Sequence, residues 1–185
     1  MIIRPFLPSD IQRVRQFADQ EIGVGYYTEA ELIENQKKSV GKNGEISSFL
    51  LIDETTDQVK GLRLAYPPGN WEHGKGSAQR SDLWPHPLSE TAYFQSLFLS
   101  ADVQGEGWGP KLSQMSIDLF RKNQVKGIAT HSWKESPYNS SVRYLEKVGF
   151  KTMIEHPLYW INVDYVCTRD GKPCRCTAME MYLEL

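Results

Sequence analysis

The sequence predicts an α/β or α+β domain that spans residues 1–185 as a single unit. Short apolar runs typical of strands alternate along the chain with amphipathic runs typical of helices. A length of 185 residues suits one domain with a core large enough for independent folding. Hydrophobic residues make up 40% of the chain and charged residues 24%, the composition of an ordinary soluble domain.

One strand and two helices are expected in the first quarter of the chain. Residues 2–6 are an apolar run typical of a strand. Ser9 is then expected to cap a helix, with Gln12 completing a capping box, and Thr28 and Glu31 repeat this spacing before a second helix. The apolar residues that share one face of the first helix are Ile11, Val14, Phe17 and Ala18.

A β-hairpin follows, and then a strand that leads into a glycine-rich turn. Residues 49–52 and 59–65 are rich in β-formers and flank a turn signal at Thr56-Asp57. Residues 93–100 form another strand-like run, after which come Gln104-Gly105-Glu106-Gly107-Trp108-Gly109-Pro110-Lys111 and a helical pattern over 112–121.

The turn at residues 104–111 predicts a phosphate-binding site. The first N–H groups of a helix have no acceptor within it, and the helix dipole is positive at that end. Glycines permit positive φ and keep side chains out of the way. Pro110 is tolerated because a first-turn N–H is unpaired in any case. We therefore expect a phosphorylated cofactor on this turn.

Two common glycine motifs do not describe this turn. The dinucleotide fingerprint G-x-G-x-x-G fits Gly105 and Gly107, but Pro110 occupies its third glycine position, and the chain has no G-x-x-x-x-G-K-[ST] string. The pattern Q/R-x-x-G-x-G/A does fit, as Gln104, Gly107 and Gly109. In this pattern the turn resembles the acyl-CoA pyrophosphate loop of the GCN5-related N-acetyltransferase (GNAT) superfamily.

The surroundings of the turn extend this resemblance over residues 93–151. Leu97-Phe98-Leu99 is similar to the family's central strand, a further strand is expected at 127–132, and a helix at 139–147 ends in Gly149-Phe150. Residues 1–65 are consistent with the family in the order of their elements. The resemblance implies a single GNAT-like domain with a mixed central sheet flanked by helices, in the order β-α-α-β-β-β-α-β-α-β-β, with a C-terminal β-hairpin.

The resemblance also implies acetyl-CoA as co-substrate and assigns residues to it. The backbone of Phe98 and Leu99 should pair with the pantetheine arm like an added strand, and the turn should hold the pyrophosphate. Asn139 is where the family often has an asparagine that reaches the pantetheine, with Ser136 or Tyr138 as alternatives. The expected cofactor-binding residues are Phe98, Leu99, Gln104, Gly105, Glu106, Gly107, Trp108, Gly109, Pro110, Lys111 and Asn139.

In this family the acyl group passes directly from the CoA thioester to an amine, so few side chains are indispensable. The family's frequent acid is a tyrosine before the E-K of its late helix; here Leu145 holds that position and Tyr144 lies one residue earlier, about 100° around the helix. Tyr144 is the candidate acid, with a core or surface role as the alternative. Glu90 and His131 are candidate bases, unless Glu90 is a solvated strand end and His131 a core hydrogen-bonding residue.

Residues 66–90 show no periodicity, which makes a functional or disordered loop the expectation. Two tryptophans argue against disorder. We predict that the segment packs over the acceptor side of the site, and a surface or dimer-contact loop is the alternative. The side chains expected to wall the acceptor pocket, unless they join the core, are Trp71, Trp84 and Trp133.

The chain has three cysteines, all near its C-terminus. A two-residue type I′ turn at Asp170-Gly171 would pair Cys167 with Cys174 and place Cys176 on the same face of a hairpin. Reduced thiols with no metal are the favoured interpretation, because C-x6-C-x-C is not a familiar zinc spacing. Zinc binding with a histidine as fourth ligand and thiol redox chemistry stay open.

The favoured function is transfer of an acetyl group from acetyl-CoA to the primary amine of a small molecule in a ternary complex. The alternatives are acetylation of a protein N-terminus or lysine, and non-catalytic acyl-CoA binding. A net charge of −2 gives no reason to expect nucleic acid, and no apolar run is long enough to cross a membrane. We expect a cytoplasmic protein and a homodimer paired through the C-terminal hairpin.

Overall fold

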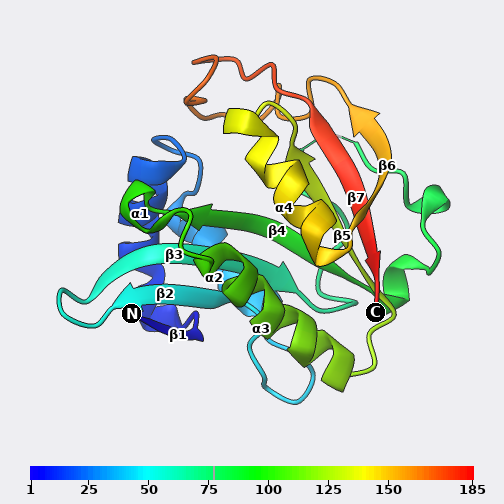
Figure 1. The fold of residues 1–185 in the computed structure, drawn as a ribbon, viewed down its shortest axis with the longest axis horizontal. Coiled ribbons are helices and arrows are strands. Elements are labelled where there is room, and N and C mark those ends of the chain that lie inside the picture. Colours follow the sequence, from blue (N-terminus) through cyan, green and yellow to red (C-terminus); the bar gives the residue numbers. More distant parts are fainter. Residues whose placement is uncertain (77) are drawn as a thin grey trace.

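Seven strands form one sheet in the order β1-β2-β3-β4-β5-β7-β6 (Figure 1). The computed structural model describes residues 1–76 and 78–185. Neighbouring strands are antiparallel except β4 and β5, which are parallel, so the sheet is mixed as expected. The strands are β1 (Ile2–Pro5), β2 (Phe49–Asp53), β3 (Gln58–Tyr66), β4 (Thr91–Leu99), β5 (Gly127–Trp133), β6 (Lys151–His156) and β7 (Ala178–Glu184).

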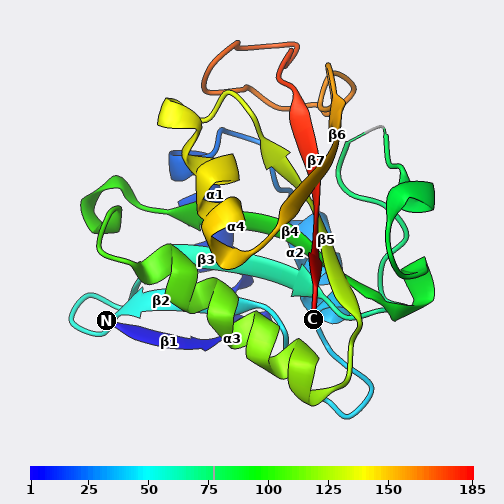
Figure 2. The same cartoon turned by 45° about the vertical axis from the view of Figure 1, so that its right-hand side comes forward.

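Four α-helices cover the two faces of this sheet. Helices α3 (Trp108–Lys122) and α4 (Ser140–Val148) lie in front of it in Figures 1 and 2, while α1 (Ile11–Glu21) and α2 (Glu29–Lys38) lie behind. Helix α3 packs on β2, β3 and β4, α4 packs on β5, and α1 packs on β3 and α2. The expected order of elements is therefore confirmed. No helix in the described part of the chain is both long and apolar enough to span a membrane.

The α2 capping prediction is confirmed, and the α1 capping prediction is wrong. Thr28 Oγ1 accepts from the Glu31 N–H at 3.1 Å, and Glu31 Oε2 accepts from the Thr28 N–H at 2.8 Å. At the other helix, residues 8–10 form a turn of 3-10 helix, so α1 begins after Asp10 and not after Ser9. The Asp10 carboxylate there accepts from the Leu7 N–H at 2.9 Å.

The segment between β3 and β4 is packed against the core. Trp71 and Trp84 are both buried in the main apolar cluster, together with Tyr93 of β4. The Trp71 ring stacks on Tyr93 at a centroid distance of 4.5 Å, and its Nε1–H donates to the Thr91 carbonyl at 2.9 Å. The expectation of an ordered segment holds for its described residues; residue 77 of the predicted loop lies outside them.

The C-terminal hairpin prediction is right about the strands and wrong about the turn. Strands β6 and β7 pair, but residues 157–177 form a long excursion between them. Cys167 bridges to Gly171 with backbone hydrogen bonds of 2.8 and 2.9 Å, so Cys167 does not pair with Cys174. Lys172-Pro173 is a cis peptide bond, and the proline also removes an N–H that a ladder would need. Asp170-Gly171 is therefore not a two-residue hairpin loop.

Candidate active site

The two halves of the sheet separate between β4 and β5. These strands pair only over Thr91–Phe94 and Gly127–Thr130, and the Thr130 hydroxyl donates to the Phe94 carbonyl at 2.9 Å at the last paired position. Beyond Phe94 and Thr130 the two strands diverge, as Figure 1 shows. We call this divergence the fork and its last paired residues the vertex. Among the described residues, β4 from Gln95 to Leu99 pairs only with β3. Its other edge is open to an extended ligand, which could add to the sheet as a strand does.

The glycine turn follows the open edge of β4 after a short 3-10 helix at Ala101–Val103. Gly105 and Gly107 have φ of +83° and +84°, and a Cβ at either position would meet nothing within 4 Å. The positive φ, and not lack of space, is therefore what requires glycine. Gly107 is the N-cap of α3, so the helix begins at Trp108, earlier than the predicted helical run over 112–121. At Gly109 in the first turn, a Cβ would approach Leu97 Cδ2 to 3.3 Å, so glycine lets the helix lie close to β4.

Side chains around the turn fix its shape and add one cation. Gln104 Nε2 donates to the Leu99 carbonyl at 2.9 Å, which ties the turn to the end of β4. Trp108 Nε1 donates to Glu106 Oε2 at 3.0 Å, and Lys111 Nζ lies 4.2 Å from the centroid of the Trp108 ring. The first N–H groups of α3 and the Lys111 ammonium thus supply donors and positive charge at the end of the open edge.

The expected asparagine of the late helix lies at the start of α4. Asn139 is its N-cap, with φ +52°, and its N–H donates to the Ser136 carbonyl at 2.7 Å. Ser136 Oγ accepts from the Ser141 N–H at 3.0 Å, so this serine caps the helix. Tyr138 is 92% exposed. Asn139 therefore lies at the helix start, and its contact with the pantetheine stays a prediction.

Tyr144 lies on the face of the sheet that α3 and α4 cover. Its hydroxyl donates to Ser113 Oγ of α3 and accepts from Arg63 Nη2 of β3 at 3.1 Å. Arg63 is 2% exposed, and its guanidinium carbon lies 4.2 Å from the centroid of the Phe94 ring. Burial lowers the pKa of Arg63, and Tyr144 opposes that shift. The Tyr144 hydroxyl thus helps to satisfy a buried guanidinium.

His131 lies at the vertex of the fork, on the opposite face. It follows Thr130 in β5, and its Nδ1 is 2.8 Å from the Tyr93 hydroxyl of β4. Its Nε2 is 3.3 Å from Glu180 Oε2. An ionised carboxylate only accepts, so Nε2 carries a proton and Nδ1 of the neutral ring accepts from Tyr93. Burial lowers the pKa of His131, which keeps the ring neutral near pH 7.

Glu180 of β7 is a buried carboxylate that the sequence analysis missed. Its oxygens accept from His156 Nε2 at 2.6 Å, from Trp84 Nε1 at 2.6 Å and from the Arg80 N–H at 2.9 Å, in addition to His131. Burial alone would raise the pKa of Glu180, but the hydrogen bonds from His131 and His156 lower it to about 2. A single charge inside the apolar run Ala178–Leu183 is the sequence signal that could have drawn attention to it.

Glu90 lies apart from the other candidates. It precedes β4, at the end away from the glycine turn, where its carbonyl accepts from the Lys126 N–H at 3.1 Å. Its carboxylate is exposed and lies 3.9 Å from His86 Nδ1. The three predicted catalytic residues are therefore not brought together: His131 is at the fork, Tyr144 on the α3 and α4 face, and Glu90 beyond the paired segment of β4 and β5.

A cavity of about 80 Å³ lies on the same face of the sheet as His131. Trp133, two residues further along β5, contributes to its wall, so the cavity begins roughly 7 Å along the strand from His131. Trp133 Nε1 is buried without a hydrogen-bond partner in the described chain. The expected role of Trp133 as a wall agrees with this, whereas Trp71 and Trp84 belong to the core. The lining residues are Glu21, Ile22, Tyr26, Phe98, Trp133, Trp160, Tyr165, Cys167, Thr168 and Cys176.

Comparison of the sequence with protein-family models and with curated proteins gives no match. Comparison of the structure does. Arabidopsis thaliana NAA60 in complex with acetyl-CoA matches with a TM-score of 0.72 and 14% identity over 100% of this chain and 98% of that chain. The Escherichia coli ribosomal-protein-S18-alanine N-acetyltransferase matches with a TM-score of 0.68 and 16% identity over 99% and 92%.

The name of a third matching enzyme refers to a small molecule. A phosphinothricin acetyltransferase of the GNAT superfamily from Sinorhizobium meliloti, in complex with acetyl-CoA, matches with a TM-score of 0.65 and 15% identity over 100% of this chain and 88% of that chain. All three matches extend over nearly the whole chain, including the fork and the glycine turn. The chain therefore has the fold of the GCN5-related N-acetyltransferase superfamily, as the glycine turn and its surroundings predict.

Proposed function

We propose that this protein is an N-acetyltransferase that transfers an acetyl group from acetyl-CoA to the primary amine of a small molecule. The observation that carries the proposal is the open edge of β4 at Gln95–Leu99, which the turn at Gly105–Gly109 follows after a short 3-10 helix at Ala101–Val103. An extended arm bonded to this edge would end with its phosphates at the start of α3. Acetyl-CoA has this shape, and two of the structural matches are complexes with it.

The co-substrate is assigned to the residues that the sequence analysis named. The backbone of Phe98 and Leu99 pairs with the pantetheine, and Asn139 contacts it from the start of α4. Residues 104–109, Pro110 and Lys111 hold the pyrophosphate with backbone N–H groups and one ammonium. The thioester then lies at the vertex of the fork, next to the last paired residues of β4 and β5.

The amine attacks the thioester carbonyl in a ternary complex, and His131 takes up its proton. The new C–N bond forms, the C–S bond breaks, and the CoA thiolate leaves. Neutral His131 can accept a proton at Nδ1 through the Tyr93 hydroxyl, which lies 2.8 Å away. Holding the two substrates together supplies most of the rate enhancement, so no side chain beyond His131 and Tyr93 is required.

The cavity supports a small acceptor. Its volume of about 80 Å³ is well below the roughly 300 Å³ at which sites for drug-sized ligands begin. Glu21 places a carboxylate in the wall, where it can attract the ammonium form of an amine before deprotonation. Burial raises the pKa of Glu21, and the charge of Asp102 raises it further. The unpaired Trp133 N–H offers the acceptor one hydrogen-bond donor.

Acetylation of a protein N-terminus is the second candidate. The observation that favours it is the match to the Escherichia coli enzyme named for an alanine of ribosomal protein S18, and the same small cavity would accommodate the first residue of a peptide. The two candidates share the co-substrate and the chemistry and differ only in the acceptor, so one experiment separates them.

The test is release of CoA from acetyl-CoA in the presence of small primary amines and, separately, of peptides with different first residues. We expect turnover with a small amine, and Glu21→Gln should raise its KM about tenfold with little change in kcat. Glu29→Gln on α2, an exposed carboxylate outside the cavity, is the matched control. Turnover with peptides alone would establish the second candidate. Acetyl-CoA binding without turnover in either panel would leave only an acyl-CoA-binding module.

A further inference from the structure

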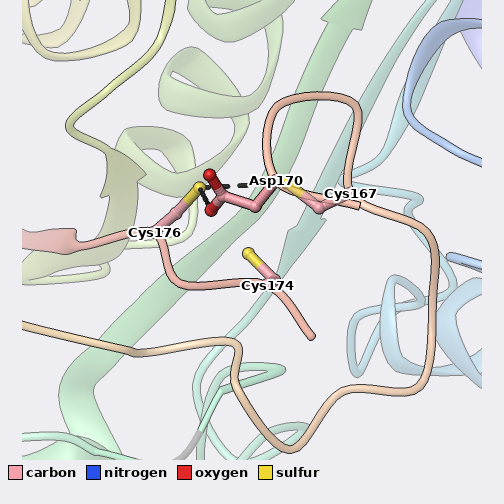
Figure 3. Close-up of side chains that lie close together, drawn as sticks. All are labelled: Cys167, Asp170, Cys174 and Cys176. Carbon is pink, nitrogen blue, oxygen red and sulfur yellow. Dashed lines mark hydrogen bonds between the residues drawn. The ribbon is translucent and has the colours of Figure 1, made fainter. Parts of the chain in front are cut away.

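Three cysteines and an aspartate meet in the excursion between β6 and β7. Figure 3 shows Cys167, Asp170, Cys174 and Cys176 around a common centre, and their sulfur and carboxylate atoms all lie within 4.8 Å of one another. The cysteines are buried, whereas Asp170 is exposed. The predicted clustering of the thiols is thus confirmed, although the turn that produces it differs from the one expected, and the fourth member is an aspartate instead of a histidine.

We propose that these four residues form a zinc-binding site. In a tetrahedral site with Zn–S bonds of about 2.3 Å, two sulfurs are about 3.8 Å apart, and a sulfur and a carboxylate oxygen are about 3.5 Å apart. The Sγ atoms of Cys167 and Cys176 are 3.9 Å apart, and Cys176 Sγ is 3.4 Å from Asp170 Oδ2. Closed structural zinc sites have four ligands and include sets with three thiolates and one histidine, and here the Asp170 carboxylate takes the fourth place.

The local backbone gives the ligands a spacing that zinc sites use. Cys167 and Asp170 are separated by two residues, as in the C-x2-C half of many zinc sites, with a carboxylate in place of the second thiolate. Paired hydrogen bonds between Cys167 and Gly171 close this short loop, and Gly171 adopts φ +74°. Counting cysteines alone gives C-x6-C-x-C, which hides the aspartate and explains why the sequence did not favour a metal.

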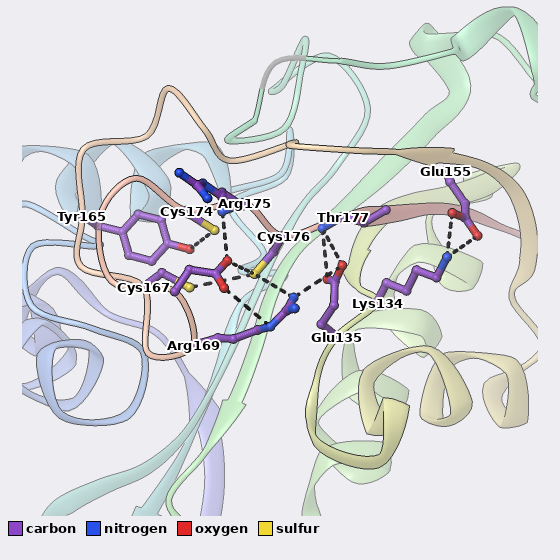
Figure 4. Close-up of polar contacts among 11 residues, drawn as sticks. Lys134, Glu135, Glu155, Tyr165, Cys167, Arg169, Cys174, Arg175, Cys176 and Thr177 are labelled. Atoms are coloured by element: carbon purple, nitrogen blue, oxygen red, sulfur yellow. Dashed lines mark hydrogen bonds and ion pairs between the residues drawn. The ribbon is translucent and has the colours of Figure 1, made fainter.

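Two arginines of the loop offset the charge of a loaded site. Three thiolates, one carboxylate and Zn²⁺ sum to −2, and the loop between the ligands carries Arg169 and Arg175, whereas the Lys172 ammonium pairs with Asp164. Arg169 Nη1 lies 4.0 Å from Cys176 Sγ, and its Nε lies 3.6 Å from Asp170 Oδ1 (Figure 4). The Arg175 N–H donates to Asp170 Oδ2 at 3.0 Å. Such outer contacts orient ligands and offset their charge.

The site would hold the wall of the acceptor cavity in place. Residues 157–177 contain no named strand or α-helix, and the excursion returns to the sheet where the Thr177 N–H donates to Glu135. Cys167, Thr168 and Cys176 nevertheless line the cavity. A metal that crosslinks the excursion contributes folding free energy to a segment with little regular structure of its own. The zinc is structural in this account and takes no part in acetyl transfer.

A second group of metal-ligating residues provides a control. His131, His156 and Glu180 also cluster, but they offer three ligands, and hydrogen bonds from both imidazoles, an indole and a backbone N–H already satisfy Glu180. Zinc bound at this group would be lost on changing His156. Zinc bound at the cysteine cluster would be lost on changing Cys174 or Asp170, so the two locations give opposite results.

The experiment measures zinc in protein purified without chelators, by elemental analysis of the native chain and of Cys174→Ser, Asp170→Ala and His156→Gln. We expect one zinc ion per chain in the native protein and in His156→Gln. We expect at least a tenfold lower zinc content in Cys174→Ser and a smaller fall in Asp170→Ala. Zinc in the native protein that is lost only in His156→Gln would overturn the assignment, as would iron in place of zinc.

Substitution with Co²⁺ keeps the proposal testable if the serine variant does not fold. The native chain should show the intense thiolate-to-cobalt charge-transfer absorption, and Asp170→Cys should keep it and bind the metal more tightly. A native, folded chain with no thiolate band and no zinc would refute the site. So would a mass two hydrogens lower, which marks a disulfide between two of the three cysteines. These readouts need no acetyl transfer, so they stand or fall independently of the proposed function.

Discussion

At the scale of single residues, Glu180 shows how one charge can be buried in the middle of a sheet. The carboxylate is fully buried, yet four hydrogen bonds converge on it from His131, His156, Trp84 and the backbone of Arg80. A buried carboxylate without partners would take up a proton. Here the donors outweigh burial, and the pKa falls to about 2 from an ordinary value of 4.5. The hydrogen bonds to this carboxylate therefore link β7 to β5, to β6 and to the segment before β4.

This lowered pKa predicts a pH-dependent contribution to stability. A depressed carboxyl pKa stabilises the fold fully above pH 4.5, and the contribution is lost as the pH falls towards 2. Glu180→Gln should lower the free energy of unfolding at pH 7 by about 3 kcal/mol, and the difference from the native chain should shrink on acidification. Urea unfolding at a series of pH values measures the difference at pH 7 and its decrease on acidification.

Glu155→Gln on β6 is the matched control for Glu180. Its carboxylate is about half exposed and pairs with Lys134 at 2.7 Å, so the expected change is under about 1 kcal/mol. A Glu180 effect that is the same at pH 7 and at pH 3 would contradict the electrostatic account of the buried charge.

The contacts of the Tyr144 hydroxyl indicate a structural role in place of the predicted role as acid. Its hydroxyl binds Ser113 and Arg63 beneath α3 and α4, so we expect Tyr144→Phe to lower the free energy of unfolding by about 1–2 kcal/mol. Turnover should change less than about twofold, because the thiolate can leave without side-chain help. Tyr138→Phe, at an exposed position near the same helix, should alter neither quantity. A fall in kcat of tenfold or more without loss of stability would establish Tyr144 as the acid.

At the scale of elements, residues 28–31 are enough to predict where α2 begins. Thr28 and Glu31 satisfy each other's backbone N–H groups, so the capping box seen in the sequence is the one in the structure. Thr28→Ala should lower the free energy of unfolding by about 1 kcal/mol, and Thr28→Ser should restore most of it. Thermal unfolding compares the two variants. Equal losses in both would mean that the methyl group, not the hydroxyl, matters.

Elements whose signals are local were predictable, and those set by long-range contacts were not. The turn at Gly105–Gly107 and the left-handed cap at Gly149 follow from backbone rules that sequence carries directly. The Asp170-Gly171 turn was predicted wrongly because Cys167 pairs with Gly171, so the dipeptide is not the two-residue loop of a type I′ hairpin. The short 3-10 turn at Pro8–Asp10 likewise displaced the predicted cap from Ser9.

At the scale of the whole molecule, the candidate site depends on how the strands of the sheet pair. The fork depends on β4 pairing in parallel with β5 and then parting from it after Phe94 and Thr130, a relation between strands far apart in sequence. Most of the residues predicted to bind the co-substrate are contiguous around one turn, which is why a local motif could single them out, and their contact with acetyl-CoA stays a prediction. Glu180 was missed because the donors to this carboxylate come from distant segments. The proximity of Asp170 to the cysteines was missed because the predicted hairpin pairing was wrong. The predicted homodimer stays a prediction, which light scattering of the purified chain tests.

Calorimetric titration with acetyl-CoA tests the central claim most directly. Gly107→Glu places a carboxylate at the N-cap of α3 and should weaken binding at least tenfold, because it opposes the pyrophosphate and occupies its space. Gly44→Glu is the matched control: its φ is +83°, a Cβ there also meets nothing within 4 Å, and it lies in a distant turn. The account predicts tight binding by the native chain and by Gly44→Glu, and loss in Gly107→Glu. No binding by the folded native chain, or equal weakening in both variants, would contradict it.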